Sequence, residues 1–289
     1  MGIARILLLF TVIVWGWTFV ATKICLAYIS PIELLGMRLI IAEPILLLLI
    51  FLKKLRFQFG AKTGQLLLAS LILIIHFIMQ ITGIKYTSAT NTGWIISMTP
   101  LVTALLAYLI LKEKISKWAI AGILIATLGI ILLMSKGKFS DLKWLSSIGD
   151  WLVLASAHTW AIYTIITRDI SRSHDPLTVA FAVLLPVLLM TLLIMGFTSD
   201  WSKFLNLPLE AVISLLFMGI CATALAYWFW QFGIARVGAT EAGVFLYLEP
   251  IATTALAVPY LHESFGIFTA LGGVMVLLGV WIAQRRSAI

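Results

Sequence analysis

The sequence has little charge. Only 11% of its 289 residues are Asp, Glu, Lys or Arg, while 62% are hydrophobic and the mean hydropathy is +1.10. An ordinary soluble domain is about 45–50% apolar and about 25% charged, so too few charged side chains are present to cover a water-soluble fold. This shortage excludes a soluble enzyme, a disordered chain and a nucleic-acid-binding domain, and it predicts an integral membrane protein.

Cysteine and the common catalytic motifs are also scarce. The two cysteines, Cys25 and Cys221, lie in apolar stretches and form neither a disulfide framework nor a CxxC pair. The GAKT stretch at 60–63 lacks the Gly-Lys-Thr order of a phosphate-binding loop, and the HE pair at 262–263 lacks the second histidine of a zinc protease. We therefore expect no enzyme, no cofactor, no metal site and no ATP-driven pump.

Long apolar runs dominate the chain. A helix needs about 20 apolar residues to cross the hydrocarbon core of a bilayer, and ten stretches reach or approach this length. They cover residues 4–24, 32–52, 64–84, 90–111, 118–135, 147–167, 177–197, 210–231, 240–260 and 266–284. Short connections leave no segment for a soluble domain, and the first stretch is too long for a cleaved signal peptide. We expect an all-α membrane protein with ten transmembrane helices.

The positions of Lys and Arg predict how the chain crosses the membrane. With a cytoplasmic N-terminus, thirteen basic residues fall in cytoplasmic segments and five, among them Lys85 and Lys203, fall outside. Basic residues favour the cytoplasmic side, so both termini are expected there. The net charge of +8 is then a topology signal and does not indicate a nucleic-acid partner.

The second half of the chain repeats the first. At an offset of 150 residues, six residues meet the same residue type in the other half. These are Thr90, Gly93, Pro100, Glu113, Gly122 and Gly129, which fall on Thr240, Gly243, Pro250, Glu263, Gly272 and Gly279. The match predicts two five-helix repeats, 1–145 and 146–289. Because five is odd, the second repeat is inverted, which is typical of secondary transporters with a binding site between the halves.

Several of these residues also carry a resemblance to a known family. The markers are the WGWTF run at 15–19, Arg38, the TP pair at 99–100, the EP pair at 249–250, Glu113, Glu263, the GD pair at 149–150, Trp160 and Tyr163. In these features the chain resembles, over nearly its whole length, the ten-span EamA-like members of the drug/metabolite transporter superfamily. The resemblance implies a carrier of small metabolites, often an exporter, with helices one to four and six to nine around the path.

Ionisable residues within the spans are candidates for function, because a charge inside a bilayer is costly. Glu43 lies mid-span before Pro44 and could bind a cationic group or carry a proton; a structural ion pair with Arg38 is the alternative. A spacing of five residues places these two side chains ~140° apart on a helix, which disfavours the pair. Glu249 could meet a substrate amine or cap backbone groups freed by Pro250. The resemblance supports Arg38, interpreted as structural, but not Glu43.

Polar and aromatic residues at matching positions of the two halves predict the substrate site. His76 and Gln80 lie one turn apart, as do their counterparts Tyr227 and Gln231. Interhelical hydrogen bonding is the plainer interpretation of one such pair. Two related pairs indicate a common central space, since lipid would leave their polar atoms unpaired. The aromatic residues expected to complete the lining are Trp15, Trp94, Trp160, Tyr163 and Trp230.

The sequence therefore predicts a secondary active transporter of a small metabolite such as an amino acid, an amine or an aromatic compound. Alternating access between the repeats would give export or exchange. A membrane channel, an intramembrane enzyme and a non-transporting receptor or assembly factor are the alternatives. The expected partners are the substrate and the lipid bilayer, with protons as a candidate coupling ion and a homodimer left open. The expected location is the prokaryotic inner membrane.

Overall fold

The computed structural model describes residues 2–103, 106, 117–138 and 147–284, and every regular element in them is helical. The first half contains α1 (Gly2–Leu26), α2 (Pro31–Leu52), η1 (Gly60–Lys62), α3 (Thr63–Tyr86), α4 (Ala89–Ile96) and α6 (Lys117–Ser135). The second half contains α7 (Ile148–Ser173), α8 (Pro176–Thr198), η3 (Trp201–Asn206), α9 (Leu209–Gly219), η4 (Ile220–Leu225), α10 (Ala226–Val237), α11 (Ala239–Phe245), η5 (Leu246–Leu248), α12 (Glu249–Leu261) and α13 (Ile267–Gln284). The predicted all-helical class is confirmed, whereas the family marker Glu113 lies outside the described residues.

Six helical segments of the described chain are long and apolar enough to cross a membrane. They are Gly2–Leu26, Pro31–Leu52, Gly60–Tyr86, Pro176–Thr198, Leu209–Val237 and Glu241–Leu261. Two shorter apolar helices cover Ile120–Ser135 and Ile267–Gly279. Large apolar side chains such as Leu48, Phe51 and Leu193 point outwards, where hydrocarbon rather than water would cover them. This is the pattern of a multi-pass integral membrane protein.

The helices α2 and α8 begin with similar caps. Ser30 precedes Pro31, and its Oγ accepts a hydrogen bond from the backbone N–H of Glu33, whose carboxylate accepts one from the Ser30 N–H (2.7 Å). Asp175 precedes Pro176, and its carboxylate accepts a bond from the Leu177 N–H (2.9 Å). Proline at the first helical position costs no hydrogen bond, and the capping side chains pair the free N–H groups behind it.

Two of the spans predicted as continuous helices are interrupted in the structure. In the stretch 90–111, α4 ends at Ile96 and helical backbone resumes at Thr99. In the stretch 240–260, the 3-10 turn η5 separates α11 from α12. The two interruptions lie at equivalent positions of the sequence repeat, directly before Pro100 and Pro250.

Proline accounts for both interruptions. Pro100 and Pro250 have no N–H to donate to the carbonyl four residues back, which leaves the carbonyls of Ile96 and Leu246 without their helical partners. The Thr99 hydroxyl donates to the Ile96 carbonyl (2.6 Å), and the Glu249 N–H donates to the Leu246 carbonyl. The backbone is thus broken and satisfied locally, as a membrane interior requires.

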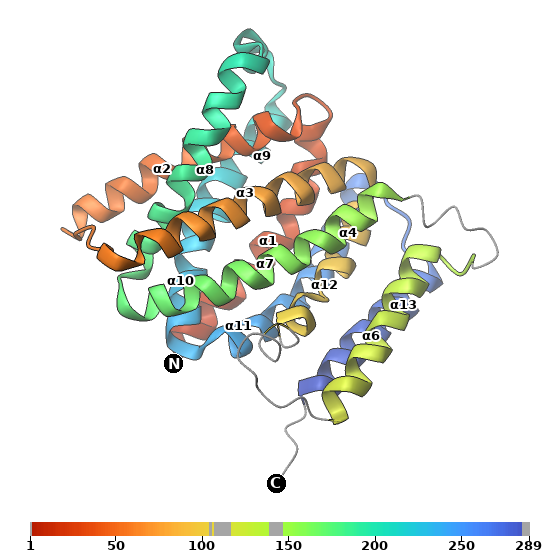
Figure 1. Cartoon of the computed structure of the whole chain (residues 1–289). Coiled ribbons are helices and arrows are strands. Elements are labelled where there is room, and N and C mark those ends of the chain that lie inside the picture. The colour runs from red at the N-terminus through yellow and green to blue at the C-terminus, as the bar shows by residue number, and fades with distance from the viewer. Residues whose placement is uncertain (1, 104–105, 107–116, 139–146, 285–289) are drawn as a thin grey trace.

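A pair of helices, α6 and α13, lies at one side of the molecule, next to α4 and α12 (Figure 1). Glycine sets their contact: a Cβ built on Gly129 would lie 2.7 Å from the Gly272 carbonyl oxygen, and one on Gly272 would lie 2.7 Å from the Gly129 oxygen. A Cβ on Gly279 would likewise meet the Gly122 oxygen at 2.6 Å. These backbones touch directly, so the four glycines allow the two helices to pack closely.

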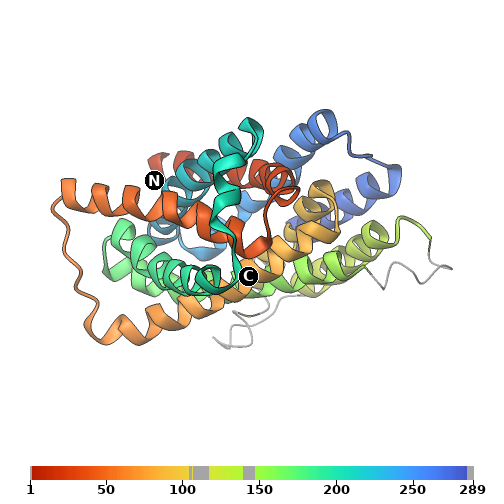
Figure 2. The same ribbon diagram turned by 90° about the horizontal axis from the view of Figure 1, so that it is seen from above.

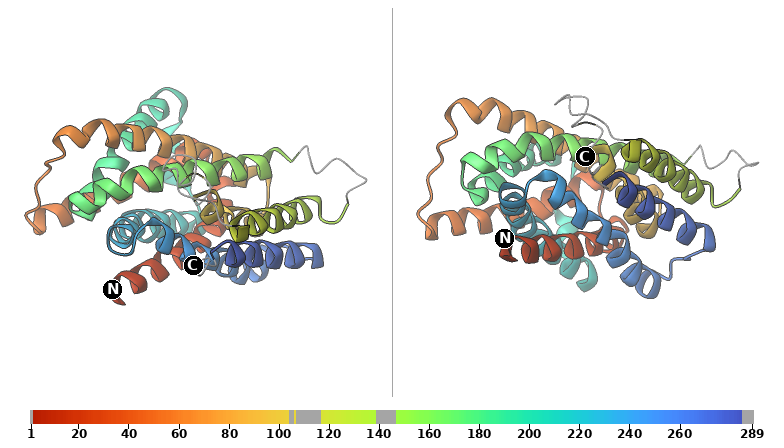
Figure 3. Two further views of the ribbon diagram at one scale, coloured as in Figure 1. Left: turned by 60° about the horizontal axis from the view of Figure 1, so that its bottom comes forward. Right: turned by 90° about the horizontal axis from the view of Figure 1, so that it is seen from below.

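Most of the remaining helices contact α1. This helix packs against α9, α10 and α12, while α3 packs along α7 and α2 along α8. The connection between α2 and α3 lies at the opposite end of the molecule from α6 and α13 (Figures 2 and 3). The largest apolar core therefore lies between α1, α2, α3, α7, α8 and α10, where most of the predicted site residues are found.

Candidate functional site

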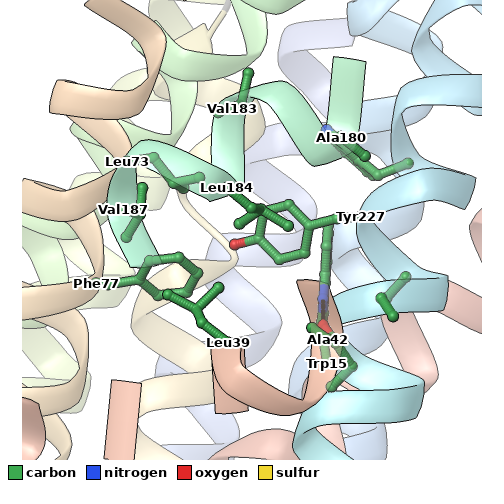
Figure 4. Close-up of a cluster of buried hydrophobic side chains, with 14 of the residues drawn as sticks. Trp15, Leu39, Ala42, Leu73, Phe77, Ala180, Val183, Leu184, Val187 and Tyr227 are labelled. Carbon is green, nitrogen blue, oxygen red and sulfur yellow. Dashed lines mark hydrogen bonds between the residues drawn. The ribbon is translucent and has the colours of Figure 1, made fainter. Parts of the chain in front are cut away.

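An aromatic cluster fills the centre of the bundle where α1, α7 and α10 meet. The rings of Trp15 and Trp160 stand nearly perpendicular, with centroids 5.0 Å apart. Tyr227 contacts these two rings at 5.6 and 5.8 Å, and Trp230 contacts them at 5.2 and 5.7 Å. Figure 4 shows Trp15 and Tyr227, with Phe77 close by. Such aromatic pairs add about 0.5–1.5 kcal/mol each beyond burial, so the cluster forms a firmly packed wall.

A π-helical turn, η4, shapes the backbone beside this wall. The carbonyl of Ala222 accepts a hydrogen bond from Trp15 Nε1 (2.9 Å). Thr223 Oγ1 accepts one from Arg38 Nε (2.8 Å) and donates to the Met218 carbonyl five residues back (2.7 Å). A π turn shifts backbone groups out of the regular helical ladder and is common at functional sites. Here it fixes the orientations of Trp15 and Arg38.

A cavity of about 40 Å³ lies against the wall. Its lining consists of Trp15, Thr18, Phe19, Arg38, His76, Phe77, Gln80, Ile96, Thr99, Trp160, Tyr227, Leu246 and Glu249. Six of the predicted site residues are among them, namely Trp15, His76, Gln80, Trp160, Tyr227 and Glu249. Since a cavity needs about 10–15 Å³ for each water, the space admits only a few water molecules in this conformation.

His76 presents one ring nitrogen to a fixed partner. Its Nδ1 lies 3.0 Å from the Ser156 carbonyl oxygen and 3.4 Å from the Thr159 hydroxyl. A carbonyl only accepts hydrogen bonds, so Nδ1 carries the proton. In the neutral ring Nε2 is then an acceptor. The imidazole also packs against Trp160, with the ring centroids 5.1 Å apart. It therefore presents a polar group of fixed orientation beside the aromatic wall.

Two charged residues of opposite sign line the same cavity. Arg38 is 3% exposed, and its guanidinium lies over the Phe77 ring, 5.1 Å from the centroid. Glu249 is 4% exposed and begins α12, where the positive end of the helix dipole favours a carboxylate. No ion pair joins the two within 4 Å. The cavity therefore has a guanidinium group and a carboxyl group at separate points of its wall.

Three predicted site residues pack behind the cavity. Gln231 is fully buried, donates to the Tyr163 hydroxyl (2.6 Å) and accepts from Ser171 Oγ (2.7 Å). Tyr163 and Trp230 are also fully buried and contact Trp160. Neither glutamine faces lipid, as the symmetry of the two polar pairs requires. Gln80 lines the space, whereas Gln231 holds the Tyr163 ring behind it.

The other two predicted site residues lie away from the cavity. Trp94 Nε1 donates to Thr254 (3.2 Å), and its ring covers Gly273 of α13. Glu43 is 3% exposed, and neither of its carboxylate oxygens has a hydrogen-bond partner. The alternative of an ion pair between Glu43 and Arg38 is therefore absent from the structure. Both residues stay candidates on the sequence pattern alone.

A wider cavity, about 640 Å³, opens where α3 ends and α7 begins. Lys85, Asp150 and Glu263 are among its charged lining residues. The Glu263 carboxylate accepts hydrogen bonds from the N–H groups of Ala89 and Thr90, both at 2.8 Å. Glu263, one of the family markers, thus caps the start of α4 and links it to the end of α12.

Arg38 lines the cavity although the sequence does not predict it there. Arg38 was recognised as a marker but interpreted as structural, and its contacts with the cavity and with η4 come from the three-dimensional fold. The signal available in the sequence was the rarity of a charge within an apolar span. Thr99 offered a second signal, since a hydroxyl directly before a mid-span proline can bond the carbonyl that the proline leaves free.

Membrane-spanning helices, two of them broken, around a buried polar and aromatic cavity define a membrane transporter by class. A family model described as the EamA-like transporter family matches residues 2–135 and 147–284. The chain belongs to this family, and like its members it is a transporter and not an enzyme.

Curated relatives agree with this assignment. An uncharacterised transporter of Archaeoglobus fulgidus is 28% identical over 290 residues, 98% of each chain. The uncharacterised transporter YyaM of Bacillus subtilis is 29% identical over 93% of this chain and 89% of its own. A protein of Salmonella typhimurium named as a probable amino-acid metabolite efflux pump is 26% identical over 96% and 93%. A crystal structure with 15% identity superposes with a TM-score of 0.70 over 97% of this chain and 96% of the other, which shows a shared fold.

Proposed function

We propose that the protein is a secondary transporter that moves a small metabolite through the central cavity by alternating access. The observation that carries this proposal is the symmetry of the cavity lining. Four pairs of lining residues occupy equivalent positions of the two halves, at offsets of 145 to 151 residues. The pairs are Trp15 with Trp160, His76 with Tyr227, Ile96 with Leu246, and Thr99 with Glu249.

Two inverted five-helix repeats, 1–145 and 146–289, are the organisation that this symmetry favours. The reciprocal contact of Gly129 and Gly272, the equivalent helix breaks, and a family model that matches two successive stretches all support it. Ten spans and two cytoplasmic termini complete the proposed topology. Inverted repeats with broken helices place the binding site at their interface in secondary transporters.

Contacts at the ends of the predicted spans support the alternation of the spans. Arg5 pairs with Glu241 (2.9 Å), and Lys203 pairs with Glu33 (2.5 Å). The Thr87 hydroxyl hydrogen-bonds to Asp150. In each pair the span count assigns both members to the same side of the membrane. A missed or extra span between two such partners would have placed them on opposite sides.

Access to the cavity requires movement. A volume of about 40 Å³ is too small for a metabolite, so the described conformation is closed around the centre. The two halves supply equivalent walls, and rocking one against the other would open the cavity first to one face and then to the other. We propose export or exchange as the direction, with protons as the coupling ion.

The test is counterflow in proteoliposomes that contain the purified protein. Vesicles loaded with unlabelled metabolite should transiently accumulate the labelled compound above its external concentration, and uptake should saturate. A channel would equilibrate the label without overshoot, and a receptor or assembly factor would move none. Either of these results, with the relevant metabolites present, would overturn the proposal.

A further inference from the structure

A further cavity, apart from the central one, collects basic side chains. Its volume is about 330 Å³, within the range of about 300–1,000 Å³ that is typical of small-molecule sites. Lys53, which follows the last residue of α2, is part of its lining. Arg172 in the last turn of α7 and Arg236 in the last turn of α10 also line it. We call this cavity the basic pocket; it shares no lining residue with the central cavity.

The three cations of the basic pocket have no counter-ion in the part of the chain that the structure describes. There, no carboxylate lies within 4 Å of Lys53, Arg172 or Arg236. Asp175 also lines the pocket, but its carboxylate accepts a hydrogen bond from the Leu177 N–H (2.9 Å) and caps the start of α8. The pocket therefore has an excess of positive charge that an anion would balance.

Aromatic rings hold two of the three cations in place. Lys53 Nζ lies 4.5 Å from the centroid of the Trp228 ring, and Arg236 Cζ lies 5.2 Å from the centroid of the Phe232 ring. The face of an aromatic ring attracts a cation. It positions these side chains without using their N–H groups, which remain available for oxygen atoms of a ligand. An ammonium and a planar guanidinium are the groups that bind phosphate in proteins.

Contacts between elements fix the edges of the basic pocket. A Cβ built on Gly238 would lie 3.7 Å from a terminal nitrogen of Arg172, so this guanidinium lies beside the turn that ends α10. His174 Nε2 lies 3.0 Å from the carbonyl oxygen of Gln58, which joins the turn between α7 and α8 to the connection between α2 and α3. The pocket is thus built by several elements that are held together.

The basic pocket adjoins the surface that faces lipid. Phe51 and Leu52, the last two residues of α2, are 78% and 66% exposed and directly precede Lys53. Trp228, which lies under Lys53, is partly exposed, and tryptophan is enriched at the level of the lipid headgroups. The helices α2 and α7 end at the same side of the molecule, where the connection between α2 and α3 lies (Figure 2). These features place the pocket at the boundary between hydrocarbon and water.

We propose that the basic pocket binds the phosphate group of an anionic phospholipid. Lys53, Arg172 and Arg236 pair with the phosphate, while the acyl chains lie against the exposed apolar side chains at the end of α2. Basic pockets between membrane helices bind anionic headgroups in this way. A soluble phosphate offers the same anion without acyl chains, so the test separates the two sources.

A ligand series with the wild-type protein tests both the charge and the acyl chains. Thermal unfolding of the purified full-length chain in a neutral detergent is measured with dioctanoyl phosphatidylglycerol, with dioctanoyl phosphatidylcholine, which is zwitterionic, and with inorganic phosphate, which has no acyl chains. Binding raises the unfolding temperature by mass action. We expect phosphatidylglycerol to give the same rise at a concentration about 10-fold lower than either of the others.

Substitutions assign the effect to the basic pocket. Lys53→Gln and Arg236→Gln should each raise the required concentration of phosphatidylglycerol about fivefold, the effect of one basic residue near a headgroup. The response to phosphatidylcholine should stay unchanged. Lys54→Gln is the matched control, because Lys54 is the next residue, is exposed and has the same charge but does not line the pocket. Salt screens such a charge, so the required concentration should change less than about twofold.

Four results would overturn the inference. Equal stabilisation by the two phospholipids would show that headgroup charge is not recognised, and stabilisation by neither would show that no lipid site exists. Equal stabilisation by inorganic phosphate and phosphatidylglycerol would indicate a site for a soluble anion. Equal losses in Lys53→Gln and Lys54→Gln would show a response to surface charge alone. The series measures no transport, so its outcome is independent of the counterflow experiment.

Discussion

Glu43 is a carboxylate held inside the bundle without a hydrogen-bond donor for either oxygen. Such a group is costly and is a functional hypothesis by default. We expect Glu43→Gln to abolish metabolite accumulation driven by a pH gradient and to preserve exchange, because glutamine keeps the shape of the side chain but cannot titrate. Uptake by proteoliposomes with and without a pH gradient measures both. An unchanged pH dependence would move the coupling to Glu249 or His76, or show that transport is passive.

The polar groups of the cavity should contribute to binding without stabilising the empty protein. Gln80→Leu and Tyr227→Phe each remove a polar group at the lining and should weaken ligand binding about 3- to 10-fold, as expected for one neutral hydrogen bond. Expression and the unfolding temperature of the ligand-free protein should be unchanged. The control is Trp118→Phe, at a half-exposed ring outside the cavity. A loss of affinity in this control equal to that of Gln80→Leu would remove the distinction between site and surface.

The sequence predicted many of the residues that line the cavity, but it did not predict which way the side chains on α2 face. Trp15, His76 and Gln80 were found because polar and aromatic side chains are unusual in apolar spans and because both halves carry them. Glu43 lies elsewhere, since α2 is apolar on nearly every face and its sequence pattern does not reveal which side is central. Arg38 was assigned to structure because nothing in the sequence indicates the π turn that orients it.

The contact between the helices α6 and α13 depends on glycine. Gly129→Ala would place a Cβ 2.7 Å from a backbone oxygen that cannot move aside, so we expect it to lower the free energy of unfolding by about 1–3 kcal/mol. Gly196→Ala in α8 meets nothing within 4 Å and should stabilise the helix by about 0.5–1 kcal/mol. Unfolding temperatures in detergent report both. Equal shifts in the same direction would show that helix propensity, and not contact, decides.

The helices themselves were largely predictable, and their interruptions were not. Apolar length predicts a span because every backbone group must be bonded within the membrane. The same pattern runs unbroken through 90–111 and 240–260. A proline in the sequence is compatible with a kink, a break or a helix start. The choice between them came from the partners available to the carbonyls of Ile96 and Leu246, which are properties of the folded backbone.

Orientation in the membrane is a property of the whole molecule. The distribution of basic residues predicts that the connection 198–208, in which Ser202 is exposed, lies outside. In a protein without its native cysteines, Ser202→Cys should react with an impermeant thiol reagent added to intact cells. Ala61→Cys, exposed in the connection after α2, should react only after the cells are opened. The reverse pattern would invert the proposed topology.

The proposed organisation of the whole molecule rests on patterns in the sequence. The repeat at an offset of 150 residues, the alternation of basic segments and the Glu-Pro and Thr-Pro pairs lie on the sequence itself. The closed state of the cavity cannot be predicted from the sequence, because it depends on how Trp15, Trp160 and Tyr227 pack against one another.

Alternating access to the central cavity is tested most directly by the accessibility of Thr18, which lines it. Cys25 and Cys221 are replaced by alanine, Thr18→Cys is introduced, and the protein is reconstituted in vesicles of one orientation. An impermeant thiol reagent is then added from one face or the other. We expect slow labelling from each face, and suppression of both by a transported metabolite. Labelling from one face only, unaffected by any such metabolite, would contradict alternating access through this cavity.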